Sequence, residues 1–307
     1  MLRRLSTSAT RARWAAELEA RANAYWTAER TAHLLDGKQP VITPREGAVL
    51  LRALGLMRDD ASIPPAQVRK YFQINHMVAL LGPALRELRA HGAIRLLDAG
   101  CGRSYLTLLL AWCARHVWHQ PLEVIGIDRD PQVIAEARRR TQLAELDDVV
   151  RFEVGDVATM RPSGVNGVVA LHACDTATCD ALALGIELEA EMLAVAPCCQ
   201  AELARGWASL AERGIAGAFA PVWGAPQLRR ETAADITDAM RVALLRAAGY
   251  EVTAMEFVPA EHTRKNTLIR AIRRGERNPD ARAAYESLRD ATGGVDIQLA
   301  RRALLTT

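Results

Sequence analysis

The sequence lacks an apolar segment that could cross a membrane, and it contains few cysteines. Its longest predominantly apolar run, residues 106–114, falls far short of the roughly 20 residues that span a bilayer. Six irregularly spaced cysteines in 307 residues exclude a disulfide-rich secreted scaffold. An apolar signal-peptide core is absent as well. These absences predict a protein of the reducing cytoplasm that has no membrane partner.

Residues 1–14 are rich in arginine and hydroxyl groups and contain no acid, a composition that resembles a mitochondrial presequence. The alternative is the arginine-rich start of an ordinary helix. We favour that alternative, because arginine replaces lysine throughout the chain.

Lysine is nearly absent, with only Lys38, Lys70 and Lys265 in the whole chain. The formal net charge of +3 neither requires nor excludes a nucleic-acid partner. Arginine groups at residues 138–140, 229–230 and 273–277 could form a phosphate-binding face. They could also be solvated helix charges, which we favour for any one group. Half of the residues are apolar, so a sizeable core can form.

The chain changes character near residue 92. Residues 11–56 and 66–90 have helical patterns, and Thr43 followed by Pro44 predicts a helix start that continues to Leu54. Beyond residue 92, short apolar runs alternate with helical segments, which is typical of a mostly parallel α/β sheet. The expected strands are residues 94–99, 122–127, 149–154, 165–171, 192–196, 250–258 and 267–271.

The fold expected from this pattern is α/β, with a Rossmann-like sheet of about seven strands and an N-terminal helical extension. Thr232 and Asp235 predict the capping box of a helix that ends at Gly249. We expect three regions: a helical part at 1–92, a ligand-binding domain at 93–274 and a helical tail at 275–307.

A glycine-rich turn, Gly100-Cys101-Gly102-Arg103-Ser104, follows the first expected strand and precedes a helix. Such a turn lets backbone approach a ligand closely and can point N–H groups at it. The third glycine of the dinucleotide fingerprint is missing, and an acid, Asp98, precedes the first glycine instead. A carboxylate at this place can hold an ammonium group, whereas it would repel a pyrophosphate.

Two further acids follow the next two strands. Asp128 ends the second strand, where a carboxylate accepts hydrogen bonds from ribose hydroxyls. Asp156 follows the third strand and can take an adenine amino group, while Val157 packs on the ring. Each acid alone has a structural alternative, and Asp130 is better explained as a helix cap. Together they predict S-adenosylmethionine binding, with an NAD site as the alternative because Asp128 would serve it equally well.

Polar groups also follow the fourth and fifth expected strands, where the methyl group of the donor would lie. His172 and Asp175 are the candidate proton acceptors, and a structural histidine is the alternative for the first. Cys174, Cys198 and Cys199 lie beside them, and buried packing explains such thiols most simply. A zinc site and a reactive thiol are less favoured, because no C-x-x-C pair and no activating base pair are visible. We expect no metal.

Five segments together resemble a bacterial family of class I methyltransferases that depend on S-adenosylmethionine. Residues 70–75, 97–106, 172–178, 197–200 and 262–266 read K-Y-F-Q-I-N, L-D-A-G-C-G-R-S-Y-L, H-A-C-D-T-A-T, P-C-C-Q and H-T-R-K-N. The resemblance covers residues 66–272. A more distant similarity reaches a eukaryotic tRNA 2′-O-methyltransferase, which implies an RNA acceptor by analogy.

The resemblance implies roles for further residues. We expect five side chains around the acceptor, namely Lys70, Gln73, Cys198, Lys265 and Asn266. For Lys70 and Lys265, a structural ion pair is an equal alternative. Two positions depart from the family pattern. The family's acid after T-A-T is Cys179 here, with Asp180 one residue later, and the proline before Lys265 is Arg264.

The function expected is methyl transfer to an oxygen or nitrogen of an acceptor, either tRNA or rRNA or a small metabolite. Donor binding is assigned to Asp98, Gly100, Gly102, Asp128, Asp156 and Val157. A donor-binding module without catalysis and an NAD-dependent oxidoreductase are the alternatives. No obligate protein partner is evident from the sequence.

Overall fold

The structure, a computed structural model, describes residues 7–88, 92–171, 173, 175–197, 200–256 and 267–304. No helix within these ranges is both long and apolar enough to span a membrane. Its seven strands form one mostly parallel sheet in the order β3-β2-β1-β4-β5-β7-β6. The strands are β1 (Ile94–Ala99), β2 (Leu122–Asp128), β3 (Val150–Val154), β4 (Gly167–Ala170), β5 (Met192–Val195), β6 (Tyr250–Glu256) and β7 (Thr267–Arg273).

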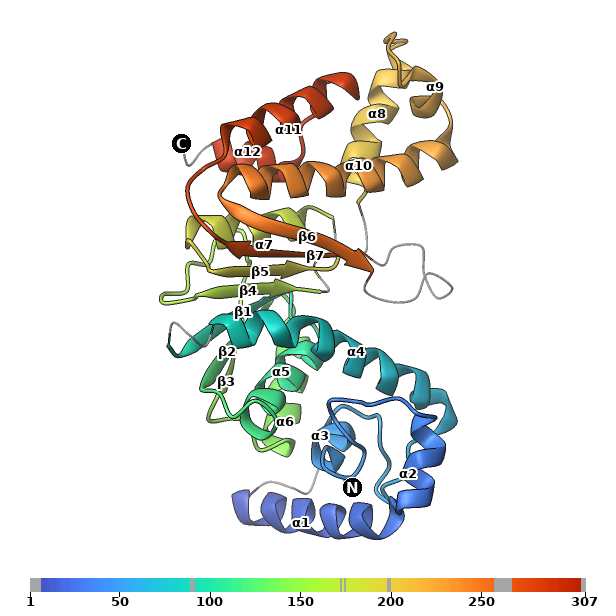
Figure 1. Cartoon of the computed structure of the whole chain (residues 1–307), viewed down its shortest axis with the longest axis vertical. Helices are drawn as coiled ribbons and strands as arrows, with labels where there is room; N and C mark the ends of the chain where they lie inside the picture. The colour runs from blue at the N-terminus through green and yellow to red at the C-terminus, as the bar shows by residue number, and fades with distance from the viewer. Residues whose placement is uncertain are drawn as a thin grey trace. The chain divides into compact units, whose positions relative to one another are not determined.

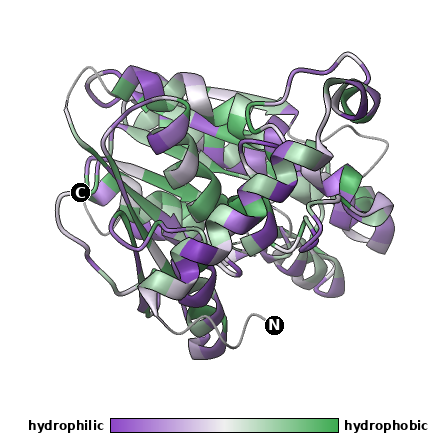
Figure 2. Ribbon diagram, turned by 90° about the horizontal axis from the view of Figure 1, so that it is seen from below, coloured by the Kyte–Doolittle hydropathy of each residue, from purple (hydrophilic) through white to green (hydrophobic). Residues whose placement is uncertain are grey.

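The pairing confirms the predicted α/β fold. Strand β4 runs parallel to both β1 and β5, whereas β7 is antiparallel to both β5 and β6. All residues of β4 and β5 are buried, which explains why these strands read as continuous apolar runs. Figure 2 shows hydrophobic residues concentrated in the strands and on parts of the helices, with hydrophilic residues on other helical faces.

By contact clustering the chain divides into two compact units. The first consists of Met1–Ala93, Gly102–Gly126 and Asp130–Val154, and the second of Ile94–Cys101, Ile127–Arg129 and Gly155–Thr307. The division into 1–92, 93–274 and 275–307 stays a prediction.

The first unit contains six helices within the described residues (blue to green in Figure 1). They are α1 (Ser8–Tyr25), α2 (Ala28–Leu35), α3 (Ala48–Ala53), α4 (Pro65–Leu88), α5 (Tyr105–His116) and α6 (Pro131–Leu143). Helix α4 packs on α5, α1 packs on α3, and α6 packs on β3. Asp130 caps α6 through bonds from the backbone N–H groups of Gln132 and Val133, as expected.

One helix start in this unit differs from the prediction. Helix α3 begins at Ala48 rather than at Pro44, because residues 44–47 form a turn. The Thr43 hydroxyl accepts from the Glu46 N–H at 3.2 Å, and the Thr43 carbonyl accepts from the Gly47 N–H at 2.9 Å. Asn75 of α4 holds the preceding residue by accepting from the Ile42 N–H at 2.7 Å. This long-range contact holds the chain just before Thr43, and a turn precedes α3 instead of an additional turn of helix.

In the second unit, α7 (Thr176–Glu187) follows β4, and five more helices follow β5 (yellow to red in Figure 1). They are α8 (Glu202–Glu212), α9 (Ala220–Trp223), α10 (Pro226–Ala247), α11 (Pro279–Ala291) and α12 (Gln298–Leu304). Helix α10 packs on β6, α8 and α11, and α12 packs on α7.

The capping box predicted at Thr232 and Asp235 is wrong. Helix α10 already begins at Pro226, and both residues lie inside it. Proline at the first position has a backbone angle that suits a helix start. The first turn is also held by Arg229, whose guanidinium donates to the Trp223 carbonyl.

Candidate donor and acceptor site

The turn after β1 is fixed by its backbone. Gly100 and Gly102 have φ values of +70° and +53°, and Ser104 also lies in the left-handed region at +61°. The N–H groups of Gly100 and Cys101 both donate to the Ile127 carbonyl, at 2.8 and 3.0 Å. These two N–H groups therefore join the end of β1 to the end of β2 instead of pointing at a ligand.

Two of the predicted carboxylates lie near this turn. Asp98 is buried, with 2% of its surface exposed, in the last but one position of β1. The pKa of the buried Cys101 thiol is raised by burial first, and then by the charges of Asp98 and Asp128. Both predicted carboxylates thus act on the same thiol and lie near the same turn.

The third predicted acid lies in a short turn after β3. The Asp156 carboxylate accepts from the Ala158 N–H at 2.9 Å and from the Arg129 guanidinium at 2.8 Å. Arg129 holds the pKa of Asp156 below its usual range, and the bond from Ala158 acts in the same direction. The Gly155 N–H donates to the Asp128 carbonyl at 2.9 Å, so the second and third predicted acids are joined by backbone. Val157 beside them is buried.

Asp175, a predicted proton acceptor, is bound on both carboxylate oxygens. One oxygen accepts from the N–H groups of Ala201 and Glu202, each at 3.0 Å, at the start of α8. The other accepts from Arg205 at 2.7 Å. The backbone of Asp175 has φ 52° and ψ −116°, a combination that a residue other than glycine rarely adopts. Asp175 therefore connects the segment after β4 to the segment after β5.

A buried arginine that sequence reasoning missed supports the same connection. Arg241 of α10 is 1% exposed and donates to the Asp175 carbonyl at 3.1 Å and to the Asp238 carboxylate at 2.8 Å. It also contacts the Cys179 sulfur at 3.3 and 3.4 Å. Gln200 donates to the second Asp238 oxygen at 2.9 Å. The only signal in the sequence was a charged residue inside the apolar stripe of a helix.

Burial raises the pKa of Asp238, and the Arg241 guanidinium opposes that effect. Burial also raises the pKa of Cys179, again against the influence of Arg241. The Cys179 thiol faces the guanidinium, and Asp238 supplies the negative charge. The arrangement makes Cys179 part of a structural network rather than a reactive thiol.

In the first unit, α4 carries Lys70 and Gln73, both half-buried. The Lys70 ammonium lies 3.6 Å from the centre of the Tyr105 ring, and the Arg140 guanidinium lies 5.2 Å from it. Burial acts to raise the pKa of Tyr105, but Lys70 and Arg140 outweigh it and lower that pKa. The structure thus brings together Lys70 of the first motif and Tyr105 of the glycine motif. Asn75 of the first motif is buried and structural.

Other predicted site residues, His172, Cys198, Lys265 and Asn266, lie outside the described residues, as do Cys174 and Cys199. Among the described residues, no group of three or more histidine, cysteine, aspartate or glutamate side chains could hold a metal.

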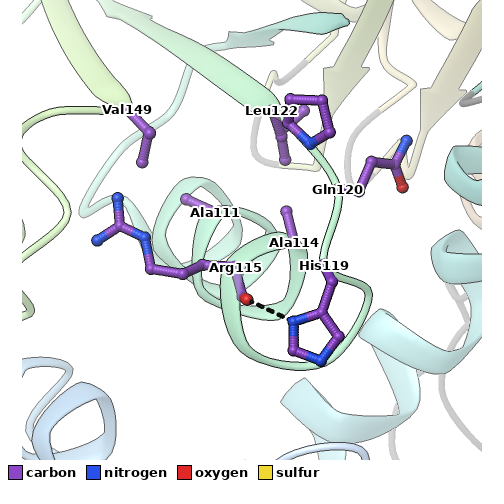
Figure 3. A pocket seen from close by; sticks show the side chains of 8 residues that line it. Ala111, Ala114, Arg115, His119, Gln120, Leu122 and Val149 are labelled. Carbon is purple, nitrogen blue, oxygen red and sulfur yellow. Dashed lines mark hydrogen bonds between the residues drawn. The ribbon is translucent and has the colours of Figure 1, made fainter. Parts of the chain in front are cut away.

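A separate hollow of about 380 Å³ lies in the first unit (Figure 3). It is lined by Ala111, Ala114, Arg115, His119, Gln120, Pro121, Leu122 and Val149. Arg115 is held by Asp148 at 2.5 Å, and the His119 ring is hydrogen-bonded to the Arg115 carbonyl. Leu122 begins β2 whereas Asp128 ends it, so the hollow lies at the amino end of that strand and is not the predicted donor site.

Residues 69–206 match a family model described as "Methyltransferase domain". Residues 69–206 are thus a methyltransferase domain, which supports S-adenosylmethionine as the methyl donor. The match spans the glycine turn, all three acids at the strand ends and the segment of Asp175. It ends before α10, so the buried Arg241 lies outside it.

No curated protein sequence matches the chain. Among solved structures, the magnesium protoporphyrin IX methyltransferase of Synechocystis PCC 6803 with bound S-adenosylhomocysteine shares 17% identity at a TM-score of 0.40, covering 74% of this chain and 93% of that one. The Podospora anserina methyltransferase PaMTH1 shares 12% at 0.43, covering 80% and 94%. Rv0187 from MTB shares 18% at 0.42, covering 80% and 97%.

Proposed function

We propose that the enzyme transfers the methyl group of S-adenosylmethionine to an oxygen or nitrogen atom of its acceptor. The observation that carries the proposal is the placement of Asp98 and Asp128 at the ends of two strands, beside a glycine turn in which Gly100 and Gly102 have positive φ values. Carboxylates at this place suit a ligand that bears an ammonium and a sulfonium.

The chemical groups of these residues match those of the donor. We assign the donor's ammonium to Asp98, its ribose hydroxyls to Asp128 and its adenine to Asp156 and Val157. Gly100 and Gly102 allow the backbone to approach it closely. A carboxylate has about four acceptor positions, so Asp156 can keep its bonds to Arg129 and Ala158 and still accept from an amino group. When bound, the donor supplies an electrophilic methyl group.

On the acceptor side, the protein acts mainly by positioning the acceptor atom for attack on the methyl group. The Asp175 carboxylate accepts three hydrogen bonds, and taking up a proton would weaken them. We therefore propose Asp175 as a positioning residue and His172 as the group that removes a proton where the acceptor must lose one. Lys70, Gln73, Cys198, Lys265 and Asn266 are the proposed acceptor-binding residues, from the resemblance of their motifs.

The proposed acceptor is RNA, tRNA or rRNA, because the motifs resemble a family with a distant tRNA-modifying relative. A small metabolite is the second candidate, and one observation favours it. The arginine groups singled out as a phosphate-binding face are largely paired: Arg139 and Arg140 with Glu136, Arg273 with Glu189, and Arg274 with Glu251. A steep salt dependence of tRNA binding would support RNA, and its absence would support the metabolite. We also propose cytoplasmic activity without an obligate protein partner.

The donor site is tested by calorimetric titration of the wild-type chain with S-adenosylmethionine and, in parallel, with NADH. We expect binding of S-adenosylmethionine alone, and at least a tenfold loss in Asp128→Ala. Asp148→Asn is the matched control, because Asp148 pairs with Arg115 at the hollow and should leave binding unchanged. Binding of NADH, or of neither ligand, would refute the proposal.

Donor binding without turnover would indicate a non-catalytic module. A screen of RNA and metabolite fractions with a tritiated methyl donor distinguishes that case. Transfer of the label to RNA by the wild type, and its loss in the variant Asp128→Ala that binds S-adenosylmethionine weakly, would identify RNA as the acceptor class.

A further inference from the structure

Helix α12, at the far end of the sequence, reaches the turn that follows β3. Arg302 donates to the Ala158 carbonyl at 3.0 Å, across 144 residues of sequence. Ala158 is part of the same turn as Asp156 and Val157, because the Asp156 carbonyl accepts from the N–H groups of Thr159 and Met160. The last described helix therefore contacts the turn that we assign to the adenine ring.

The Arg302 side chain is held firmly in this place. Its other terminal nitrogen donates to Asp180 of α7 at 2.8 Å, and the two side chains are only 19% and 9% exposed. Asp180 also accepts from Gln298 of α12 at 3.3 Å. A salt bridge this sheltered is screened far less by water and salt than a surface pair. One planar guanidinium thus joins α7, α12 and the turn, a geometry that a lysine could not reproduce.

The ion pair between Arg129 and Asp156, which also holds this turn, is weaker because it lies at the surface. Arg129, which binds Asp156, is 69% exposed, and such pairs contribute little. Arg161 donates to the Ala158 carbonyl at 3.2 Å, and its own partner is Glu187. Of the three arginines that contact the turn, Arg302 is the most buried. Its charge also contributes to the lowered pKa of Asp156, after Arg129 and the bond from Ala158.

We propose that Arg302 is a positioning residue for the adenine-binding turn, so that α12 is a functional part of the donor site. The inference rests on the proposed function, because it takes Asp156 and Val157 as the adenine contacts. In this proposal Arg302 acts through the turn and not by contact with the donor. It fixes the Ala158 carbonyl, and thereby the direction in which the Asp156 carboxylate accepts a hydrogen bond.

The test compares two ligands by calorimetry: S-adenosylhomocysteine and its 6-oxo analogue S-inosylhomocysteine, which lacks the amino group that Asp156 would accept from. We expect Arg302→Gln to bind S-adenosylhomocysteine roughly tenfold more weakly than wild type, the scale of one hydrogen bond. Binding of the 6-oxo analogue should change less than about twofold, so the preference for adenine falls. Arg302→Lys should lie between wild type and Arg302→Gln.

Arg301→Gln is the matched control. It removes the same charge from the same helix, but Arg301 bonds to Glu202, Gln298 and the Asp296 carbonyl rather than to the turn. We expect its adenine preference to equal that of the wild type. Thermal unfolding of each variant without ligand shows whether the fold is intact.

The outcomes separate this inference from the proposed function. No binding of S-adenosylhomocysteine by the wild type would refute the proposed function itself. Wild-type binding with an unchanged adenine preference in Arg302→Gln would overturn only the positioning role. An equal loss for both ligands would also overturn it, because general loosening of the site cannot lower the preference for one base.

Discussion

The two sides of the candidate site are held together by different kinds of bond. On the donor side, the ends of β1, β2 and β3 are joined by backbone N–H groups of Gly100, Cys101 and Gly155. On the acceptor side, the segments after β4 and β5 are joined by side chains, the Asp175 carboxylate and the Arg241 guanidinium. Side-chain substitutions on the donor side should therefore affect ligand binding more than stability. On the acceptor side they should affect both.

The largest effect is expected from Arg241→Met, which removes the cation from a buried pair. Asp238 would be left buried without its partner, which typically costs about 3–5 kcal/mol of stability. Denaturant unfolding measures the loss. The control is Arg205→Gln at the 62% exposed end of the same connection, where less than about 1 kcal/mol is expected. Equal losses of stability in Arg241→Met and Arg205→Gln would show that burial does not determine how much each ion pair contributes.

The same variant should gain a pH dependence. Burial raises the pKa of Asp238, and Arg241 counteracts this in the wild type, so its removal should raise that pKa further. A carboxyl with a raised folded-state pKa contributes stability that is complete below the unfolded pKa, about 3.9, and is lost as the pH rises through the folded value. Stability of Arg241→Met relative to wild type should therefore fall as the pH rises above about 4, by about 1.4 kcal/mol per pH unit at most. A pH-independent difference would contradict the assignment.

Asp175 gives an intermediate effect. Asp175→Ala removes three accepted hydrogen bonds and should cost about 2 kcal/mol of stability together with most of the methyl-transfer rate. Asp175→Asn keeps one carbonyl oxygen for the Ala201 and Glu202 N–H groups, so it should retain most of both. If Asp175→Asn is stable but as inactive as Asp175→Ala, Asp175 is a base and the comparison between the two sides fails.

Gly100→Ala tests the backbone of the donor side. A Cβ at this position would meet Ala173 at an ordinary 3.6 Å, so the cost comes from the φ of +70° and should be about 1–2 kcal/mol. Gly37→Ala is the control, because Gly37 has φ +76° with nothing within 4 Å of the added atom. Both should lose similar stability, while only Gly100→Ala loses donor affinity by calorimetry. Unchanged affinity would place the donor elsewhere.

The smallest effect is expected from Arg129→Gln. Its bond to Asp156 is on the surface, so stability should change by less than about 0.5 kcal/mol and donor affinity by less than about twofold. A tenfold loss would instead show that Arg129, rather than backbone and Arg302, orients the Asp156 carboxylate.

Sequence reasoning worked best where the signal is local. All seven strands were located to within a few residues, because buried strands between turn residues are visible as short apolar runs. The cap at Asp130 and the helix after the glycine turn, α5, also followed from neighbouring residues. The start of α10 was missed, because Thr232 and Asp235 have the right spacing for a cap but Pro226 and Arg229 had already begun the helix.

By itself, the sequence determined the order of strands and helices, the glycine turn and the acids at the strand ends. These features depend on residues within a few positions of one another, whose backbone preferences and periodicity are independent of the rest of the chain. Only the tertiary structure decided that Asp175 binds the start of α8, that Arg241 bonds to Cys179 62 residues away, and that Arg302 reaches Ala158. Many carboxylates and carbonyls in the sequence could accept from an arginine, and packing selects one of them by bringing it within hydrogen-bond distance while excluding water.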